Sequence, residues 1–204
     1  MMKLLYAAPS PFVRKVFVTA HIKGVMDRIT LVATDTNMPT NAVLRAANPV
    51  AKIPTLVLED GTSLYDSGVI CEYLDTLTPE HPLFAASGIE RYRLLTRAAL
   101  ADGIMDAALL IVYEGRFRPA DKRVEAWVDR QQAKVEAGLA ELEAQLLKKD
   151  VRPLDYSHVT CACALGYLDL RFEGAWRTSH PALVAWLDQF ARDVPSYGAV
   201  IPAG

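Results

Sequence analysis

The stretch from Asn48 to Leu58, Asn-Pro-Val-Ala-Lys-Ile-Pro-Thr-Leu-Val-Leu, constrains the fold more than any other part of the chain. Its second half is a short apolar strand, and Pro54 takes the first position of that strand. Proline has no backbone N–H to donate to a neighbouring strand, so it fits at the start or the edge of a sheet. The Ile53–Pro54 bond can be trans or cis, and a cis bond would leave the Ile53 backbone free to pair with an extended peptide. The alternative interpretation is an ordinary turn before a strand.

A hairpin and a helix start follow this strand. We predict a hairpin turn at Glu59-Asp60-Gly61-Thr62, because Asp-Gly supplies the positive φ angles of a type I′ turn. Ser63-Leu64-Tyr65 is then the return strand, and Asp66-Ser67 caps a helix that runs to Asp75. The run therefore contains Lys-Ile-Pro, a strand, a hairpin, a second strand and an acidic residue followed by serine at a helix start.

This combination resembles the second half of the thioredoxin-like domain of cytosolic glutathione transferases. In that family, the backbone before a cis-proline pairs with the cysteinyl part of glutathione. An acidic residue followed by serine at the third helix holds the γ-glutamyl end. The segments Ser-Pro-Phe-Val-Arg-Lys at 10–15 and Ala-Asp-Gly-Ile-Met-Asp at 101–106 extend the resemblance over essentially the whole chain. It is closest to small bacterial members of the serine type.

We predict two domains, a thioredoxin-like α/β domain over residues 1–77 and an all-helical domain over residues 85–204. Strand and helix patterns alternate in the first domain in the order β-α-β-α-β-β-α, which is the thioredoxin-like order of the family. Two prolines in the polar segment 77–82 indicate the boundary. Beyond it there is no strand pattern, and helices are predicted over 89–116, 121–149, 155–171 and 181–191.

The composition excludes several classes of protein. The chain has 204 residues, is 51% hydrophobic and carries a net charge of −2, so nothing indicates binding to nucleic acid. No apolar run approaches the roughly 20 residues that span a membrane, and the N-terminus is predicted to be a strand, not a signal peptide. The three cysteines lack a disulfide framework and fit a reducing, cytoplasmic compartment. Cys161 and Cys163, two apart on a predicted helix, are expected to be small buried packing residues.

The resemblance implies a glutathione site on the first domain, with glutathione as co-substrate and no metal. Lys52 is expected to meet the glycine carboxylate, and Ile53, held before Pro54, to pair with the cysteinyl amide groups. Ser67 lies at a helix N-terminus, where backbone N–H groups favour the γ-glutamyl carboxylate. Asp66 is expected to pair with the ammonium group.

Ser10 is the candidate for activating the glutathione thiol. It follows the first strand and begins the first helix, where a hydroxyl donor and the helix dipole both favour a thiolate. Lowering the pKa of a thiol by two units needs about 2.7 kcal/mol. One charge-assisted hydrogen bond of about 1.5–3 kcal/mol and the helix end together suffice. Two alternatives stay open, that Ser10 only caps the helix and that Tyr6 is the thiol donor. Serine in place of cysteine argues against mixed-disulfide chemistry.

A second set of candidates comes from the helix predicted over 89–116. Asp102 and Asp106 fall on a stripe with Leu95, Ala99 and Leu109, so we expect this face to border a cleft or an interface, with a simple rim position as the alternative. Either carboxylate would add a second contact for glutathione, across a subunit boundary as in some relatives. The residues expected to shape a pocket for the electrophile, between the domains, are Tyr113, Arg116 and Phe117.

The sequence departs from the family pattern at one helix cap, and two charged residues lie off the apolar stripe of the first helix. Asp155 is predicted as the N-cap of the helix over 155–171, but His158 stands where the family usually has an aspartate. The cap is therefore expected to be less robust, or pH-sensitive through an Asp155–His158 contact. In the first helix, Arg14 and Lys15 lie off the apolar stripe and are expected to be solvated.

These features predict a cytoplasmic, homodimeric glutathione transferase that activates the glutathione thiol for attack on a small apolar electrophile, as in detoxification. One alternative is a non-catalytic binding module of the same fold, serving a protein partner or carrying a ligand. The presence of Ser10, Lys52, Pro54, Asp66 and Ser67 disfavours it. Another alternative is a glutathione-dependent isomerase or reductive dehalogenase. The sequence does not indicate the electrophile, because fold does not fix function.

Overall fold

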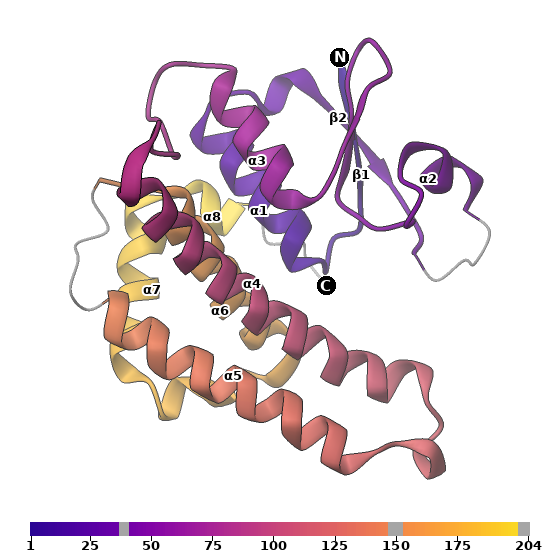
Figure 1. Ribbon diagram of the computed structural model, residues 1–204, viewed down its shortest axis with the longest axis vertical. Helices are drawn as coiled ribbons and strands as arrows, with labels where there is room; N and C mark the ends of the chain where they lie inside the picture. The colour runs from indigo at the N-terminus through magenta and orange to yellow at the C-terminus, as the bar shows by residue number, and fades with distance from the viewer. Residues whose placement is uncertain (37–40, 147–152, 200–204) are drawn as a thin grey trace. The chain divides into compact units, whose positions relative to one another are not determined.

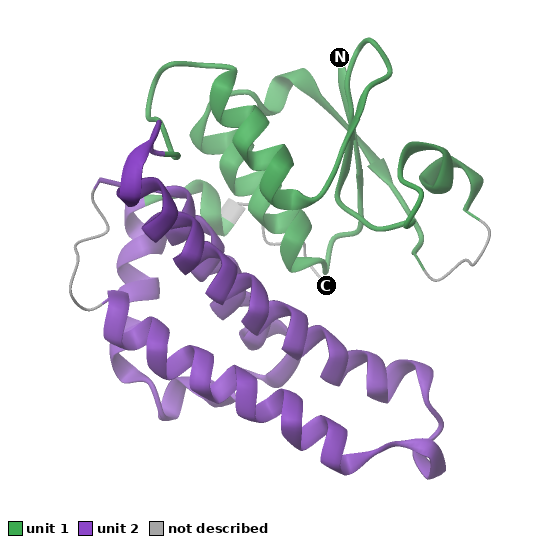
Figure 2. Ribbon diagram, viewed as in Figure 1, with its two compact units in different colours: residues 1–84, 194–204 green, residues 85–193 purple. Residues whose placement is uncertain are grey.

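The computed structural model describes residues 1–36, 41–146 and 153–199. The chain divides into two compact units, which are described separately (Figure 2). The first unit is Met1–Phe84 with the segment from Val194 onward, and the second is Ala85–Asp193. The first unit therefore continues past residue 77 and also includes the described residues 194–199. The domain limits 1–77 and 85–204 stay a prediction.

A four-stranded sheet in the order β2-β1-β3-β4 forms the centre of the first unit. Strands β1 (Met2–Tyr6) and β2 (Ile29–Ala33) are parallel, as a strand–helix–strand crossover requires. Strand β3 (Thr55–Val57) runs antiparallel to β1, and β4 (Ser63–Leu64) runs antiparallel to β3. Leu4 and Leu56 pair across β1 and β3 and are fully buried, so the core lies under the central strands.

Three helices complete the first unit in the predicted β-α-β-α-β-β-α order. Helices α1 (Pro11–Ile22) and α3 (Ser67–Thr76) pack together on one side of the sheet, and α2 (Ala42–Ala47) lies on the other (Figure 1). A 3-10 turn, η1 (Met26–Arg28), leads from α1 into β2. The thioredoxin-like fold predicted for the N-terminal part is confirmed.

Among the described residues of the second unit, all regular secondary structure is helical. Its α-helices are α4 (Gly88–Phe117), α5 (Glu125–Leu146), α6 (Tyr156–Phe172) and α7 (Pro181–Asp193), with 3-10 turns η2 (Ala120–Lys122) and η3 (Ala175–Thr178). Helix α5 approaches α4 closely at Gly138, where an added Cβ would lie 2.5 Å from Cγ1 of Ile104. The α5 helix was predicted from 121 to 149; it begins later, at Glu125, and residues 147–149 lie outside the described part of the chain.

Helix α6 is the buried helix of this unit, as its small residues predicted. Cys161 and Cys163 are both fully buried on it, which confirms them as packing residues. Burial raises the pKa of the Cys161 thiol, so this cysteine stays a neutral thiol at physiological pH.

The N-terminus of α6 carries a complete capping box. Asp155 accepts hydrogen bonds from the His158 N–H, at 3.2 Å, and from the Ser157 hydroxyl. In return, the Asp155 N–H donates to Nδ1 of His158 at 3.1 Å, so histidine replaces the usual acidic acceptor. The buried Arg97 donates to Ser157 Oγ at 2.9 Å and completes the network. The predicted Asp155–His158 contact is confirmed, and the cap keeps both of its hydrogen bonds; its pH sensitivity stays a prediction.

The prediction that Arg14 and Lys15 are solvated was wrong. The Lys15 side chain is fully buried, with Nζ 5.6 Å from the centre of the Phe12 ring. The Arg14 guanidinium stacks 4.3 Å from the centre of the Tyr197 ring and donates to the Tyr197 carbonyl at 3.4 Å. Tyr197 belongs to α8 (Ser196–Ala199), a short helix near the C-terminus that the sequence pattern did not indicate. A segment far along the chain therefore covers the face of α1 that local periodicity assigned to solvent.

The turn between β3 and β4 also differs from the prediction. The Gly61 N–H bonds to the Leu58 carbonyl at 3.1 Å, and only Gly61 in this turn has a positive φ, of 89°. A type I′ turn needs positive φ at both central residues, so this is another kind of turn. Thr62 is held by the Asp60 carboxylate, which accepts its N–H at 2.8 Å.

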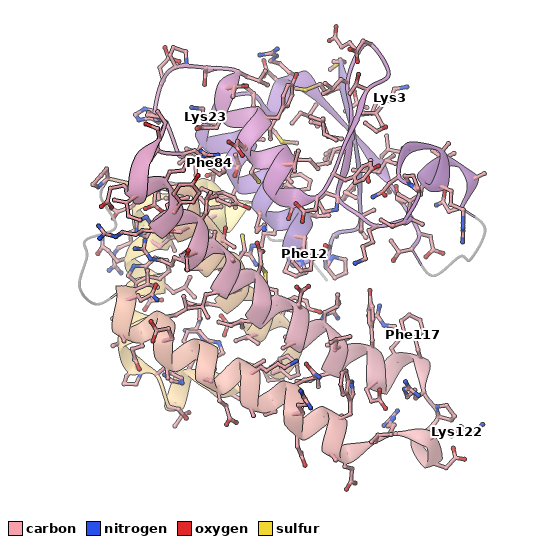
Figure 3. All side chains as sticks on the ribbon, in the orientation of Figure 1. Lys3, Phe12, Lys23, Phe84, Phe117 and Lys122 are labelled. Atoms are coloured by element: carbon pink, nitrogen blue, oxygen red, sulfur yellow. The ribbon has the colours of Figure 1, made fainter. Side chains whose placement is uncertain are left out.

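The segment after α3 is fixed by an ion pair that connects distant parts of the first unit. Lys23 Nζ lies 3.0 Å from Oδ1 of Asp75, and the Lys23 side chain is fully buried. The same ammonium donates to the carbonyls of Glu80 and His81. The Asp75 carboxylate accepts the N–H groups of Leu83, at 2.9 Å, and Phe84, at 3.1 Å (Figure 3 labels Lys23 and Phe84). This segment, predicted as a linker, is therefore held by specific hydrogen bonds.

Candidate functional site

Three segments that carry predicted site residues meet at one end of the sheet in the first unit. Strand β1 ends at Tyr6, shortly before Ser10, and its residue Leu5 pairs with Thr55, the first residue of β3. Leu64, the last residue of β4, pairs with Leu56, one position along β3. Because these neighbouring strands are antiparallel, the chain after β1, the chain before β3 and the chain after β4 lie at the same edge. Ser10, Lys52–Pro54 and Asp66-Ser67 are thereby brought to one end of the sheet.

Ser10 is the N-cap of α1. Its hydroxyl oxygen accepts the Val13 N–H at 3.3 Å, and Pro11 takes the first helical position, as the sequence predicted. A hydroxyl has two acceptor lone pairs and one donor, so the cap uses only one lone pair. The half-buried Ser10 can therefore cap the helix and still donate its proton to a ligand.

The loop before β3 presents backbone groups at this edge. The Lys52 carbonyl accepts from Nδ2 of the buried Asn48 at 3.0 Å and from the Thr55 hydroxyl at 2.8 Å. The two donors, Asn48 and Thr55, come before and after Ile53 in the chain, so their bonds to the Lys52 carbonyl hold the loop in place. The Ile53–Pro54 bond is cis. Among the described residues, the Ile53 N–H and C=O make no hydrogen bond, and the Lys52 side chain is exposed.

Asp66 and Ser67 form the start of α3. Asp66 is the N-cap and accepts the Gly68 N–H at 2.9 Å through Oδ1, which leaves its other carboxylate oxygen toward solvent. The sequence predicted that Asp66 and Ser67 together cap the helix. Only Asp66 is the N-cap, and Ser67 is the first residue of the helix itself. Its hydroxyl makes no hydrogen bond to any residue that the structure describes, although the side chain is buried. A free hydroxyl beside helical N–H groups suits a carboxylate ligand.

Tyr6, the other thiol donor considered, packs its ring edge-to-face against Phe17, with ring centres 5.8 Å apart. This contact agrees with a packing role for its ring inside the strand.

Known proteins resemble the chain over its entire length. A sequence model described as the glutathione S-transferase N-terminal domain matches residues 9–77, and one described as the C-terminal domain matches residues 125–189. An uncharacterized GST-like protein of Escherichia coli, YibF, is 34% identical over 200 residues, which are 94% of this chain and 95% of YibF. The chain belongs to the glutathione S-transferase family.

Solved structures of family members agree with the fold. A glutathione transferase family member from Pseudomonas fluorescens, crystallised with glutathione, is 41% identical, with a TM-score of 0.92 and complete coverage of both chains. A second structure from that organism, with S-(propanoic acid)-glutathione, has a TM-score of 0.89 at the same identity and coverage. The two-part glutathione transferase fold, thioredoxin-like and helical, is therefore confirmed for this chain.

The second unit of this family member contains two groups of residues that the sequence analysis singled out, both on α4. Tyr113 and Phe117 lie edge-to-face with ring centres 5.0 Å apart, and Arg116 lies over the Tyr113 ring. By contrast, Ala99 and Asp106 are exposed, and Asp102 is half-buried. The core-facing side of α4 is a different one, which includes Arg97, Ala98, Ala101, Ile104, Met105 and Ala108. The face that carries Asp102 and Asp106 therefore lies outside the core of the unit, and whether it borders a cleft or an interface stays a prediction.

Two further residues of this family member escaped the sequence analysis. Tyr167 lies one turn from Arg171 on α6, with the Arg171 guanidinium over its ring. Tyr113 and Arg116 of α4 are close enough to Tyr167 for their charges to affect the pKa of its hydroxyl. The one available signal was a Tyr and an Arg at i and i+4 on a helix rich in small residues. It was too general to separate a site from a helix surface.

Within the described part of the chain, no helix combines the length and apolar character that crossing a bilayer requires. The described residues also contain no group of three histidine, cysteine or acidic side chains that could hold a metal ion.

Proposed function

We propose that this family member is a glutathione transferase of the serine type, which binds glutathione at the sheet edge of the first unit. The observation that carries the proposal is the convergence of Ser10, the Ile53 backbone and Ser67 at one edge, each with an unused hydrogen-bonding group. Lys52 and Asp66 add one charge of each sign. The glutathione found in the P. fluorescens relative supports the same ligand here.

The groups at this edge match the parts of glutathione. The Ile53 backbone would pair with the cysteinyl amide groups as a neighbouring strand does. Ser67 and the first N–H groups of α3 would bind the γ-glutamyl carboxylate, with Asp66 at the ammonium. Lys52 would meet the glycine carboxylate. Such a set fixes both ends of the peptide and leaves its thiol for Ser10.

The Ser10 hydroxyl would then donate a hydrogen bond to the thiolate and lower the pKa of the bound thiol. The proton leaves to solvent, and the thiolate attacks the electrophile. A serine cannot form a mixed disulfide, so thiol transfer through the protein is not part of this proposal. A non-catalytic module has no need of these groups, which favours the enzyme.

The glutathione site is tested by titrating the protein with glutathione in a calorimeter. Wild-type protein is expected to bind in the micromolar to low-millimolar range, and Ser67→Ala to weaken binding about tenfold or more, because a charge-assisted hydrogen bond is lost. Ser87→Ala is the matched control, since Ser87 precedes α4 and its exposed side chain makes no capping bond. Absence of binding by the wild type at high glutathione would favour the non-catalytic module.

We also propose that this protein is cytoplasmic and works as a homodimer. Ile89 and Tyr92 of α4 are large apolar residues that are 62% and 64% exposed, and clustered exposed apolar residues commonly mark interaction surfaces. Asp102 and Asp106, further along this helix, are the candidates for contacting a partner subunit's glutathione. Light scattering is expected to give the mass of two chains, and Tyr92→Glu to reduce it to one. A monomeric wild-type protein would contradict this.

A further inference from the structure

Five side chains on α4 and α6 form what we call the tyrosine–arginine cluster: Tyr113, Arg116, Phe117, Tyr167 and Arg171. The centres of the Tyr113 and Phe117 rings are 5.0 Å apart, and the Arg116 guanidinium lies 5.9 Å from the centre of the Tyr113 ring. On α6, the Arg171 guanidinium lies 5.7 Å from the centre of the Tyr167 ring. All five belong to the second unit, so the cluster is complete within it. It combines two permanent positive charges with aromatic surface.

The Tyr167 hydroxyl is the unusual group of the cluster. Tyr167 is only 3% exposed, and Arg171, which carries only donors, is the polar side chain beside its hydroxyl. The hydroxyl therefore donates its own proton to none of the described residues. Burial raises the pKa of Tyr167, an effect that the charge and the N–H groups of the neighbouring Arg171, and the charge of Arg116, only partly offset, so the hydroxyl stays protonated and can donate. Buried polar groups of native proteins are nearly always paired with protein or water, so the proton of this hydroxyl is available to a ligand that reaches the cluster.

The positive charges of the cluster are also without a carboxylate partner among the described residues. Glu114, on the same helix as Arg116, is bound by Arg118 at 2.8 Å. Asp169, on the same helix as Tyr167, is bound by Arg177 and by the indole N–H of Trp176. These two neighbouring acids are thus engaged elsewhere, and Nε of the half-buried Arg171 makes no hydrogen bond to any residue that the structure describes. The cluster therefore offers several donors and two positive charges but contains no acidic side chain to match them.

We propose that the tyrosine–arginine cluster binds a carboxylate group carried by the electrophilic substrate. A guanidinium matches the two oxygens of a carboxylate, and a phenol adds a third donor. The Tyr113 and Phe117 rings would hold the apolar body of the same molecule. This inference rests on the proposed function and specifies its substrate class, an aromatic or other apolar electrophile with one negative charge.

A suitable probe is a chloronitrobenzoate whose chlorine substituent is on the ring carbon adjacent to the one that bears the nitro group. Glutathione loses its thiol proton to solvent, and its sulfur forms a bond to the ring carbon that bears chlorine. Chloride leaves with the bonding electron pair, so the products are the conjugate, chloride and a proton. The methyl ester of the same compound undergoes the same displacement without the negative charge, and each variant is compared with wild type on both compounds.

We expect Arg116→Gln to lower kcat/KM for the chloronitrobenzoate by about tenfold, the loss of one charge-assisted hydrogen bond. For the methyl ester, the same variant should change kcat/KM by less than about twofold, because no charge-assisted bond is lost. Tyr167→Phe should show the same selective loss. Arg130→Gln is the matched control, since Arg130 is an exposed arginine of α5 outside the cluster. Equal losses on acid and ester, or none on either, would overturn the proposal.

Binding alone provides a readout that needs no turnover. Nitrobenzoate, which lacks the leaving group, should bind to wild-type protein in a calorimeter, at least about tenfold more tightly than methyl nitrobenzoate, and lose this preference in Arg116→Gln. No preference in the wild type would overturn the inference. So would a loss of glutathione affinity in Arg116→Gln with nitrobenzoate binding unchanged, because the cluster would then bind glutathione's own carboxylate. Failure of the proposed function is separate, as it appears as absent glutathione binding by the wild type.

Discussion

Replacing Asp75 with alanine is expected to lower the free energy of unfolding of the first unit by about 3–5 kcal/mol. The substitution leaves the Lys23 ammonium, whose side chain is fully buried, without its counter-ion 3.0 Å away. It also removes the acceptor for the N–H groups of Leu83 and Phe84. Since a domain is typically stable by about 5–15 kcal/mol, the loss is a large share of the total. Urea unfolding, followed by probes in each unit, measures it.

Two further variants separate this ion pair from a general effect of losing a carboxylate. Asp27→Ala removes an exposed carboxylate of η1 and should change the stability by less than about 0.5 kcal/mol. Lys23→Met combined with Asp75→Asn removes both charges and should be more stable than Asp75→Ala alone, because no unpaired buried charge remains. If Asp75→Ala costs no more than the Asp27 control, the ion pair does not hold this segment.

The second large effect is expected at Ser10, where alanine should lower the rate of glutathione conjugation by about tenfold to a hundredfold. A hydrogen bond to the thiolate is worth about 1.5–3 kcal/mol, which is this range of rates. The same loss should raise the pKa of bound glutathione toward the value of about 8.5 for a free thiol. The thiolate absorbs in the ultraviolet, so a pH titration of the glutathione complex measures that pKa directly.

Because Ser10 also caps α1, its two roles need separate variants. Ser10→Asp keeps an oxygen that can accept the Val13 N–H but offers no donor to a thiolate, so it should retain the helix and lose the activity. Ser10→Thr keeps both the cap and the donor and should restore much of the rate. Tyr6→Phe should leave the rate nearly unchanged. A Ser10→Ala enzyme with full activity and an unshifted thiol pKa would make Ser10 a helix cap only and return attention to Tyr6.

Much of the fold could be predicted because its signals are local. Ser10-Pro11 marks a helix start and Asp155 marks a cap, and Ser10 and Asp155 each accept a hydrogen bond from a residue within one turn. Pro54, predicted as the first residue of a strand, stands immediately before β3, which begins at Thr55. The predicted order of elements in the first unit followed from these signals. The turn at Gly61 shows the limit of this approach, since Asp-Gly is compatible with more than one turn type and only the observed φ angles decide between them.

The candidate glutathione site was also predictable, but through the resemblance more than through physics. Each residue alone had a structural explanation, and Ser10 and Asp66 do cap helices. The strand register supplied what the sequence lacked, because it placed three separate segments at one edge of the sheet. Only the α4 residues of the tyrosine–arginine cluster were predicted from the sequence. Tyr167 and Arg171 become notable only once the burial of Tyr167 and its neighbours on α4 are known.

The sequence by itself determined the succession of strands and helices, their caps and the chemical inventory of the site, since these depend on residues close together in the chain. The tertiary structure alone decided which charged side chains are buried. Lys15 and Lys23 lie on or just after one helix, and local periodicity could not distinguish them from solvated lysines. Their burial depends on partners elsewhere, with Asp75 fifty-two positions after Lys23. A buried charge is tolerated only where distant groups compensate for its lost hydration, and only folding brings those groups together.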